Sequence, residues 1–329
     1  FKDYETQTSA SVRYTSPTDP YSVQWQQAMS WVRENTPEMS IFVHWWDYGY
    51  WIQTIGKRPT VTDGGHTIAY WDHLTGRYLL TTPKPETALS LMKSYNVSYL
   101  LIDSTDLGKY SAYSIIGSDK TNKDRLAQIP VMLLSPSQTA EKNSSERRVY
   151  QGVTFVDEDI IFGAGENQIF LPQDKAAVVG MIIEVSKNSD GSASFSQPQA
   201  VYVYNQKQTI IPARYLHYEG SLMDFGGGLN ATIKIIPQVS QTSSQGGLQI
   251  DKIGAAIYLS PKVSKGLFAQ LYLLNDPLKN YETIILAHSQ PDTIVDSLNQ
   301  QGANLGDLVY FNGFRGPIKI WKIDYPENI

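Results

Sequence analysis

The chemically most distinctive group in this sequence is a run of five consecutive residues, namely Trp45, Trp46, Asp47, Tyr48 and Gly49. A hydroxyl group both donates and accepts hydrogen bonds, so two indole N–H donors beside a carboxylate acceptor can satisfy one serine or threonine hydroxyl. The run follows apolar residues and ends at a glycine, which predicts a buried strand over residues 41–45 that breaks into a turn. We therefore expect the two indoles and the carboxylate to point outward together at the end of a strand and to bind an alcohol group.

Asp106, Lys109 and Tyr113 form a second candidate group. Their spacing of three and four residues places a carboxylate, an ammonium and an aromatic ring on one face of a helix. An apolar strand is predicted over residues 97–102, so this group also follows the end of a strand. Because the carboxyl ends of strands in open α/β sheets commonly form one ligand crevice, we expect the two groups to lie beside each other.

Each group also has a simpler interpretation. Tryptophan contributes mainly a large apolar surface, so Trp45 and Trp46 alone are typical of a packed core. Asp106 and Lys109 alone are typical of an exposed ion pair, which contributes only a few tenths of a kcal/mol. The five-residue run as a whole favours the binding site over these alternatives.

The run at 45–49 matches, without a mismatch, the signature of the catalytic subunit of oligosaccharyltransferase, and the chain resembles this family. Members of the family are membrane enzymes that N-glycosylate asparagine in Asn-X-Ser/Thr sequons. The likeness continues through Gly56, Arg58 and Pro59 to residues 63–65. It is strongest over the first 135 or so residues and is most similar to the archaeal branch, of the AglB type.

The second group also fits this resemblance. Asp106 and Lys109 resemble the Asp-X-X-Lys element of the archaeal and eukaryotic members, whereas Tyr113 stands where the family usually has Met or Ile. The resemblance implies that Trp45, Trp46 and Asp47 hold the sequon hydroxyl and that the helix with Lys109 forms the neighbouring wall. The tyrosine leaves open how that wall contacts the threonine methyl group.

The resemblance further implies partners and a location that the sequence alone does not show. We expect a multi-pass membrane domain N-terminal to this chain, a cell-membrane location and an extracytoplasmic position for this domain. The expected substrates are an acceptor polypeptide with Asn-X-Ser/Thr and a lipid-linked oligosaccharide of the dolichol-phosphate type. The resemblance places Mg²⁺ or Mn²⁺ on carboxylates of the membrane part and none in this chain. The whole protein is then a glycosyltransferase, and this fragment alone is expected to be inactive.

Composition excludes other classes. The 329 residues are 41% hydrophobic and 18% charged, as in a globular protein. A net charge of −5, with no long basic run, argues against a nucleic-acid partner. The chain has no cysteine, and its five histidines show no metal-binding helical pair. No apolar stretch approaches the roughly 20 residues that span a bilayer.

The order of predicted elements indicates a mixed α/β central core with an inserted antiparallel β-rich unit. A helix is predicted to start at Pro20 with Asp19 as its N-cap. Strands and helices alternate over residues 39–116, which is typical of an α/β layer with at least two parallel strands. A polar stretch follows, and short β-branched runs then recur between Gly, Asn, Ser and Pro. Near the end of the chain, a helix is predicted over 263–274 and a closing strand over 318–323. We predict a core over 1–135, the insertion over 136–211 and the return of the core over 212–329.

Two rival functions remain open at this stage. With 21 Tyr and 7 Trp, the chain also fits an extracellular carbohydrate-binding module whose aromatic rings, Trp51 among them, stack on sugars. The other rival is a glycoside hydrolase that uses Asp47 and Asp103, which requires two carboxyl groups about 5 to 10 Å apart across an open cleft. The acidic triplet 157–159 is either a calcium ligand or, more simply, a solvated turn.

Overall fold

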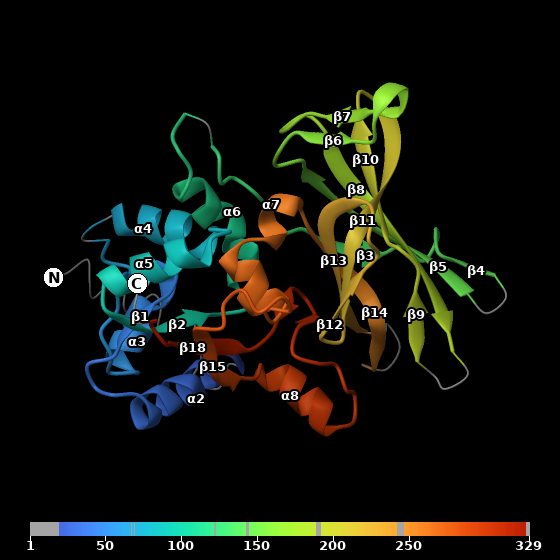
Figure 1. Cartoon of the computed structure of the whole chain (residues 1–329). Coiled ribbons are helices and arrows are strands. Elements are labelled where there is room, and N and C mark those ends of the chain that lie inside the picture. Colours follow the sequence, from blue (N-terminus) through green and yellow to red (C-terminus); the bar gives the residue numbers. More distant parts are fainter. Residues whose placement is uncertain are drawn as a thin grey trace.

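A helix-and-sheet part and a β-barrel lie side by side in the molecule (Figure 1). The computed structural model describes residues 20–326 except 67, 69, 122, 143–144, 189–191 and 242–246. No helix within these described residues has both the length and the apolar character needed to cross a bilayer.

A four-stranded sheet organises the first part, in the order β1-β2-β18-β15. Its strands are β1 (Ile41–Val43), β2 (Val97–Ile102), β15 (Ile284–Gln290) and β18 (Ile318–Ile323). The predicted parallel pair is confirmed, because β1 runs parallel to β2. Strand β18 then pairs antiparallel with β2 and with β15. Strand β1 is shorter than the predicted 41–45, since the chain leaves the sheet at His44.

Helices surround this sheet: α2 (Pro20–Asn35), α3 (Gly49–Thr54), α4 (Tyr70–Leu74), α5 (Pro85–Ser94), α6 (Asp106–Ile116), α7 (Pro261–Ser264) and α8 (Thr293–Gln300). The predicted helix at Pro20 is confirmed, and its proposed cap Asp19 lies outside the described residues. The helix predicted over 263–274 is divided into α7 and a π-helical turn, Ala269–Leu273. The break occurs where the Leu267 N–H leaves the helix pattern and donates to the Thr82 carbonyl at 2.9 Å.

Seven strands form the barrel: β3 (Val131–Leu134), β5 (Ser145–Phe155), β8 (Ala177–Lys187), β10 (Gln199–Tyr204), β11 (Lys207–Tyr218), β13 (Leu229–Gln241) and β14 (Leu248–Leu259). Neighbours along this barrel are antiparallel, and a parallel pairing of β11 with β13 closes it. The expected antiparallel character is confirmed, but the prediction that strands after residue 211 rejoin the central core is wrong for β13 and β14. The division at 135 and 211 itself stays a prediction.

Short strands flank the barrel: β4 (Ala140–Lys142), β9 (Ala193–Phe195), β12 (Ser221–Asp224), β16 (Val309–Tyr310) and β17 (Phe314–Arg315). A separate hairpin of β6 (Ile160–Phe162) and β7 (Ile169–Leu171) stands at one end of it.

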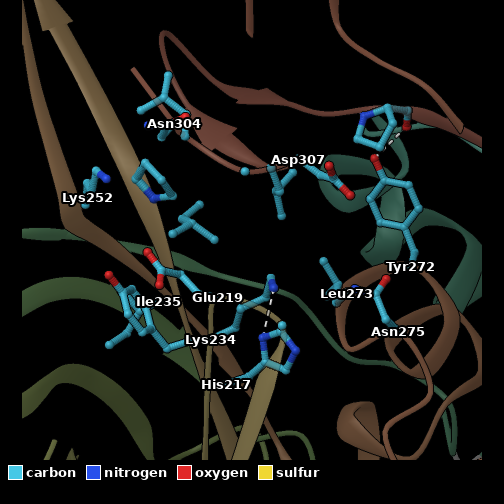
Figure 2. Close-up of a pocket in the computed structure, with 18 of the residues that line it drawn as sticks. His217, Glu219, Lys234, Ile235, Lys252, Tyr272, Leu273, Asn275, Asn304 and Asp307 are labelled. Carbon is cyan, nitrogen blue, oxygen red and sulfur yellow. Dashed lines mark hydrogen bonds between the residues drawn. The ribbon is translucent and has the colours of Figure 1, made fainter. Parts of the chain in front are cut away.

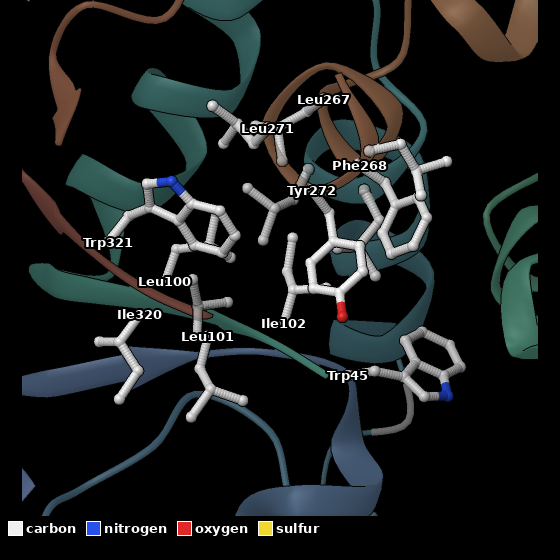
Figure 3. Packing of buried hydrophobic residues seen from close by; sticks show 14 of the residues in the cluster. Trp45, Leu100, Leu101, Ile102, Leu267, Phe268, Leu271, Tyr272, Ile320 and Trp321 are labelled. Carbon is white, nitrogen blue, oxygen red and sulfur yellow. The ribbon is translucent and has the colours of Figure 1, made fainter. Parts of the chain in front are cut away.

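The main hydrophobic core lies between the four-stranded sheet and the segment that follows α7. Leu100 and Ile102 of β2 pack in one cluster with Phe268 and Tyr272, and Trp45 lies at its edge (Figure 3). Burial of these apolar surfaces fixes the positions at which β1 and β2 end. The turns that follow β1 and β2 are therefore attached to a rigid, well-packed core.

Gly49 is required where the strand-end turn enters α3. A Cβ atom at this position would lie 2.4 Å from the Asp63 Cβ and 2.6 Å from the Thr62 carbonyl oxygen. Two chain segments thus meet at a point where only glycine fits.

Replacing Gly49 with alanine should therefore destabilise the fold by about 1–3 kcal/mol, the usual cost of overpacking. Gly108 is the matched control, because a Cβ there meets no atom within 4 Å and lies in the exposed part of helix α6. Gly108→Ala should stabilise by about 0.5–1 kcal/mol through helix propensity. Urea unfolding of both variants measures this, and equal stability of Gly49→Ala and the parent would contradict it.

Candidate functional site

The predicted strand-end group is divided between the core and the surface. Trp45 is 2% exposed, and its ring lies 5.4 Å from that of Tyr113. The expectation that both indoles point outward is therefore wrong for Trp45. Trp46 and Asp47 are half-buried in a short 3₁₀ turn, Trp46–Tyr48, and they remain accessible. The Trp45 ring thus packs in the core, whereas Trp46 and Asp47 lie at its edge.

Helix α6 brings the second group against this turn, as predicted. The Lys109 Nζ lies 2.5 Å from Asp47 Oδ2, and both side chains are part-exposed, at 30% and 23%. The same ammonium donates to the Tyr48 hydroxyl at 3.1 Å and lies 4.5 Å from the centre of its ring. The carboxylate, the ammonium and the phenol thus form one compact polar cluster at the ends of β1 and β2.

Tyr48 connects the turn to the start of helix α6. Its hydroxyl donates to Asp106 Oδ1 at 2.9 Å and lies 2.9 Å from Thr105 Oγ1. The ring stacks on Trp25 of α2 at a centroid distance of 5.0 Å. Burial and the nearby carboxylate of Asp106 raise the pKa of Tyr48 well above its usual value. The phenol is therefore neutral, and it both accepts from Lys109 and donates to Asp106.

Asp106 is a buried carboxyl group with an unusual pKa. It is 1% exposed, and its Oδ2 accepts the Asp103 backbone N–H at 3.0 Å. Burial raises its pKa from 3.8 to about 7, although the charge of Lys109 acts in the opposite direction. Asp106 thus positions Tyr48 and, through the Tyr48 hydroxyl, also Lys109. Asp106 itself does not face the solvent.

Tyr113 lies at a different place from the one predicted. It is fully buried, and its hydroxyl donates to the Asp106 carbonyl at 3.4 Å. Its ring contacts Trp45, so it acts on the turn through that indole and does not form an open wall. The larger ring replaces the Met or Ile expected from the resemblance and fills the space under Trp45.

Several contributors were not predicted from the sequence. Thr105 and Trp25 hold the Tyr48 side chain from two sides. His66 lies edge-on to Trp46 at 4.6 Å, and its Nδ1 is 2.7 Å from Asp72 Oδ2. The sequence carries only a weak signal for Thr105, its place just before a helix, and none for the other contacts, which are long-range.

The glycoside hydrolase alternative is not supported by the carboxyl pair it requires. Asp103 is fully buried, and its Oδ1 accepts the Thr105 N–H at 2.7 Å. It therefore does not face Asp47 across an open cleft.

The described part of the chain does not provide a metal site. No three His, Asp or Glu side chains in it are grouped so that they could hold an ion. In the acidic triplet, Asp157 is buried and accepts the Ser260 hydroxyl at 2.6 Å, where it supports the start of α7. The resemblance places Mg²⁺ or Mn²⁺ on the membrane part, so the expectation of that metal stays a prediction.

The raised pKa of Asp106 predicts a pH-dependent stability. Between the unfolded value of 3.8 and the folded value of about 7, the folded state binds more protons. The free energy of unfolding should therefore fall as pH rises through this window, by at most about 4 kcal/mol. In Asp106→Asn the amide can donate to Tyr48 and accept from Asp103, so the fall should be smaller. Urea unfolding at pH 4.5 to 8 measures this, and parallel profiles for variant and parent would contradict it.

Part of the chain is similar to known proteins. Residues 38–162 match the model of the STT3/PglB/AglB core domain. The chain is 35% identical over 102 residues to dolichyl-phosphooligosaccharide-protein glycotransferase 1 of Pyrococcus furiosus. The aligned stretch covers 30% of this chain and 10% of that protein. The chain therefore spans only a small part of the curated relatives it matches.

Solved structures show weaker similarity over a longer stretch. The C-terminal domain of PglB from C. jejuni is 11% identical, with a TM-score of 0.42 and coverage of 92% of this chain and 100% of that one. AglB from Archaeoglobus fulgidus, in complex with an inhibitory peptide and a dolichol-phosphate, is 12% identical, with a TM-score of 0.38 and coverage of 91% and 32%. An Archaeoglobus fulgidus oligosaccharyltransferase in complex with Zn and sulfate is 21% identical, with a TM-score of 0.29 and coverage of 35% and 18%.

Proposed function

Because residues 38–162 match the STT3/PglB/AglB core domain, we propose that this chain reads the acceptor sequon for an oligosaccharyltransferase. In this proposal the turn at 45–48 binds the Ser or Thr hydroxyl of Asn-X-Ser/Thr. The asparagine then reaches a reaction centre in another part of a larger membrane protein, whose donor is a dolichol-phosphate-type oligosaccharide. The observation that carries the proposal is the part-exposed pair of Asp47 and Lys109 beside the two indoles.

The polar groups of the turn have the capacity for a hydroxyl ligand. Asp47 has its ion pair with Lys109 through Oδ2, and a carboxylate accepts up to about four hydrogen bonds. Within the described residues, neither the Trp45 nor the Trp46 indole donates to a protein acceptor. A hydroxyl that donates to Asp47 and accepts from an indole N–H would satisfy both kinds of group.

Lys109 keeps Asp47 in a fixed position in this proposal. A carboxylate that is held by an ammonium on one side has one side left for the ligand. The ammonium is itself fixed by Tyr48, which Asp106 holds from the core. Recognition thus depends on a series of contacts that begins at the buried Asp106, and only Asp47 at its exposed end contacts the acceptor.

Such a site discriminates against acceptors that lack the hydroxyl. An alanine or valine at that position leaves a donor or an acceptor without a partner, which costs roughly 1–3 kcal/mol for each group. Sites of this kind can discriminate by about 10⁴ to 10⁵. The methyl group of threonine adds at most about 0.8 kcal/mol of buried CH₂ over serine.

The transfer step is outside this chain in our proposal. The metal-dependent chemistry and the membrane part are therefore proposed for the rest of the enzyme, and the fragment alone is proposed to be inactive. The carbohydrate-binding alternative stays a prediction. Trp51, the ring it uses, packs edge-on against Trp25 at 4.7 Å.

Asp47→Ala, in a complete enzyme that carries this chain, should nearly abolish transfer to an Asn-X-Thr peptide and leave donor binding unchanged. The reason is that the hydroxyl loses its acceptor. Asp124→Ala is the matched control, because it removes the carboxylate of a part-exposed ion pair with Arg77 in the same part of the fold. Parent-level peptide glycosylation by Asp47→Ala, measured by gel shift or mass spectrometry, would refute the assignment.

Lys109→Met should cause a smaller loss than Asp47→Ala. The substitution keeps the apolar stem and removes the charge, so Asp47 remains present but is less well fixed. We expect the KM for the acceptor to rise about tenfold, as for the loss of a charged hydrogen bond. If the acceptor KM of the variant equals that of the parent, Lys109 has no part in the site.

A further inference from the structure

A cavity lies between the barrel and the four-stranded sheet, away from the strand-end turn. It has a volume of about 570 Å³. Its lining includes His217 of β11, Lys234 of β13 and Tyr272 of the π-helical turn (Figure 2). Lys319 of β18 also lines it. A cavity of this size is in the range of small-molecule sites in proteins, about 300–1,000 Å³.

Two lysines with spare donors face this cavity from opposite parts of the fold. Lys234 Nζ lies 3.0 Å from His217 Nδ1, which is its only hydrogen-bond partner within the described residues (Figure 2). Lys319, only 4% exposed, donates to Asn275 Oδ1 at 2.9 Å and to the Tyr272 carbonyl at 3.4 Å. An ammonium has three N–H donors, so two remain on Lys234 and one on Lys319.

Neither lysine has a carboxylate at salt-bridge distance in the described part of the chain. The lining also includes two exposed acidic residues, Asp307 and Glu219, and the charge of Asp307 favours the charged form of both lysines. Burial and the charge of Lys319 together lower the pKa of Lys234 to about 7, although the charge of Asp307 acts in the opposite direction. Burial also lowers the pKa of Lys319. A bound anion would remove this cost, because a buried charge is stable only when it is paired.

We propose that this cavity binds a small phosphate-type oxyanion between Lys234 and Lys319. Three free N–H donors match the oxygens of a phosphate group, and neutral His217 adds no competing charge. The burial of His217 lowers its pKa to about 3, which keeps the ring neutral and able to accept from Lys234. The anion would connect the barrel to the sheet, since the two lysines belong to β13 and β18.

The cavity is larger than a free phosphate ion, and part of its lining is apolar, including Leu273 and Leu308. The same phosphate chemistry can therefore come from inorganic phosphate or from a small phosphomonoester whose organic part contacts these leucines. Both carry the tetrahedral dianion that the lysines would bind.

The test is a calorimetric titration of the 329-residue chain at pH 7 and constant ionic strength, with inorganic phosphate in one arm and glycerol 3-phosphate in the other. Lys234→Met and Lys319→Met keep the apolar stem of each side chain and remove its charge. Lys322→Met is the matched control, because Lys322 is an exposed residue of the same strand β18 and does not line the cavity.

We expect saturable binding in at least one arm, weakened about tenfold or more by each cavity substitution and unchanged by Lys322→Met. Tighter binding of glycerol 3-phosphate identifies the ligand as an organic phosphate, and tighter binding of the free ion identifies inorganic phosphate. A thermal shift caused by the ligand in the parent, and absent in the folded cavity variants, gives a second readout. No saturable binding in either arm, or an equal loss in Lys322→Met, would overturn the proposal.

Discussion

The hydroxyl of Tyr48 connects the strand-end turn to helix α6. It accepts from Lys109 and donates to Asp106, so one phenol sets the position of both charged groups. The ring is fixed by Trp25 and buried in the core, which prevents it from turning away. Because Lys109 in turn pairs with Asp47, the exposed end of the cluster is only as well placed as this buried phenol.

The ends of two strands hold that cluster in place. Parallel strands β1 and β2 end at the same edge of one sheet, and each is followed by a turn and a helix. Gly49 lets the first turn approach Asp63 closely, and Asp106 binds the backbone at the end of the second strand. The polar site thus depends on apolar packing under it, in which Trp45 and Tyr113 are partners.

Much of this arrangement could be predicted from the sequence, where the signals are local. Apolar runs predicted β2 and β18, and Pro20 predicted the start of α2. Helical spacing predicted that Asp106 and Lys109 share one helix, and the ends of the two strands predicted that this helix lies near Asp47. The parallel pairing followed from the alternation of strands and helices.

The errors concern contacts between distant residues. A tryptophan in a turn can point either way, and the ring of Tyr113, far along the chain, decides that Trp45 is buried. Closure of the barrel by β11 and β13 joins strands whose patterns do not reveal their partners. The buried pair of lysines likewise comes from two strands on either side of the barrel boundary, so no local pattern indicates it.

The central claim, that Asp47 reads an acceptor hydroxyl, is tested most directly by a cycle that removes the carboxylate and the hydroxyl separately and together. The ratio of kcat/KM for Asn-X-Thr over Asn-X-Val peptides is measured in the complete parent enzyme and in its Asp47→Asn variant. Valine has the shape of threonine without its hydroxyl, so the account predicts a large ratio in the parent that falls at least about tenfold in the variant. The same ratio in both enzymes would contradict it.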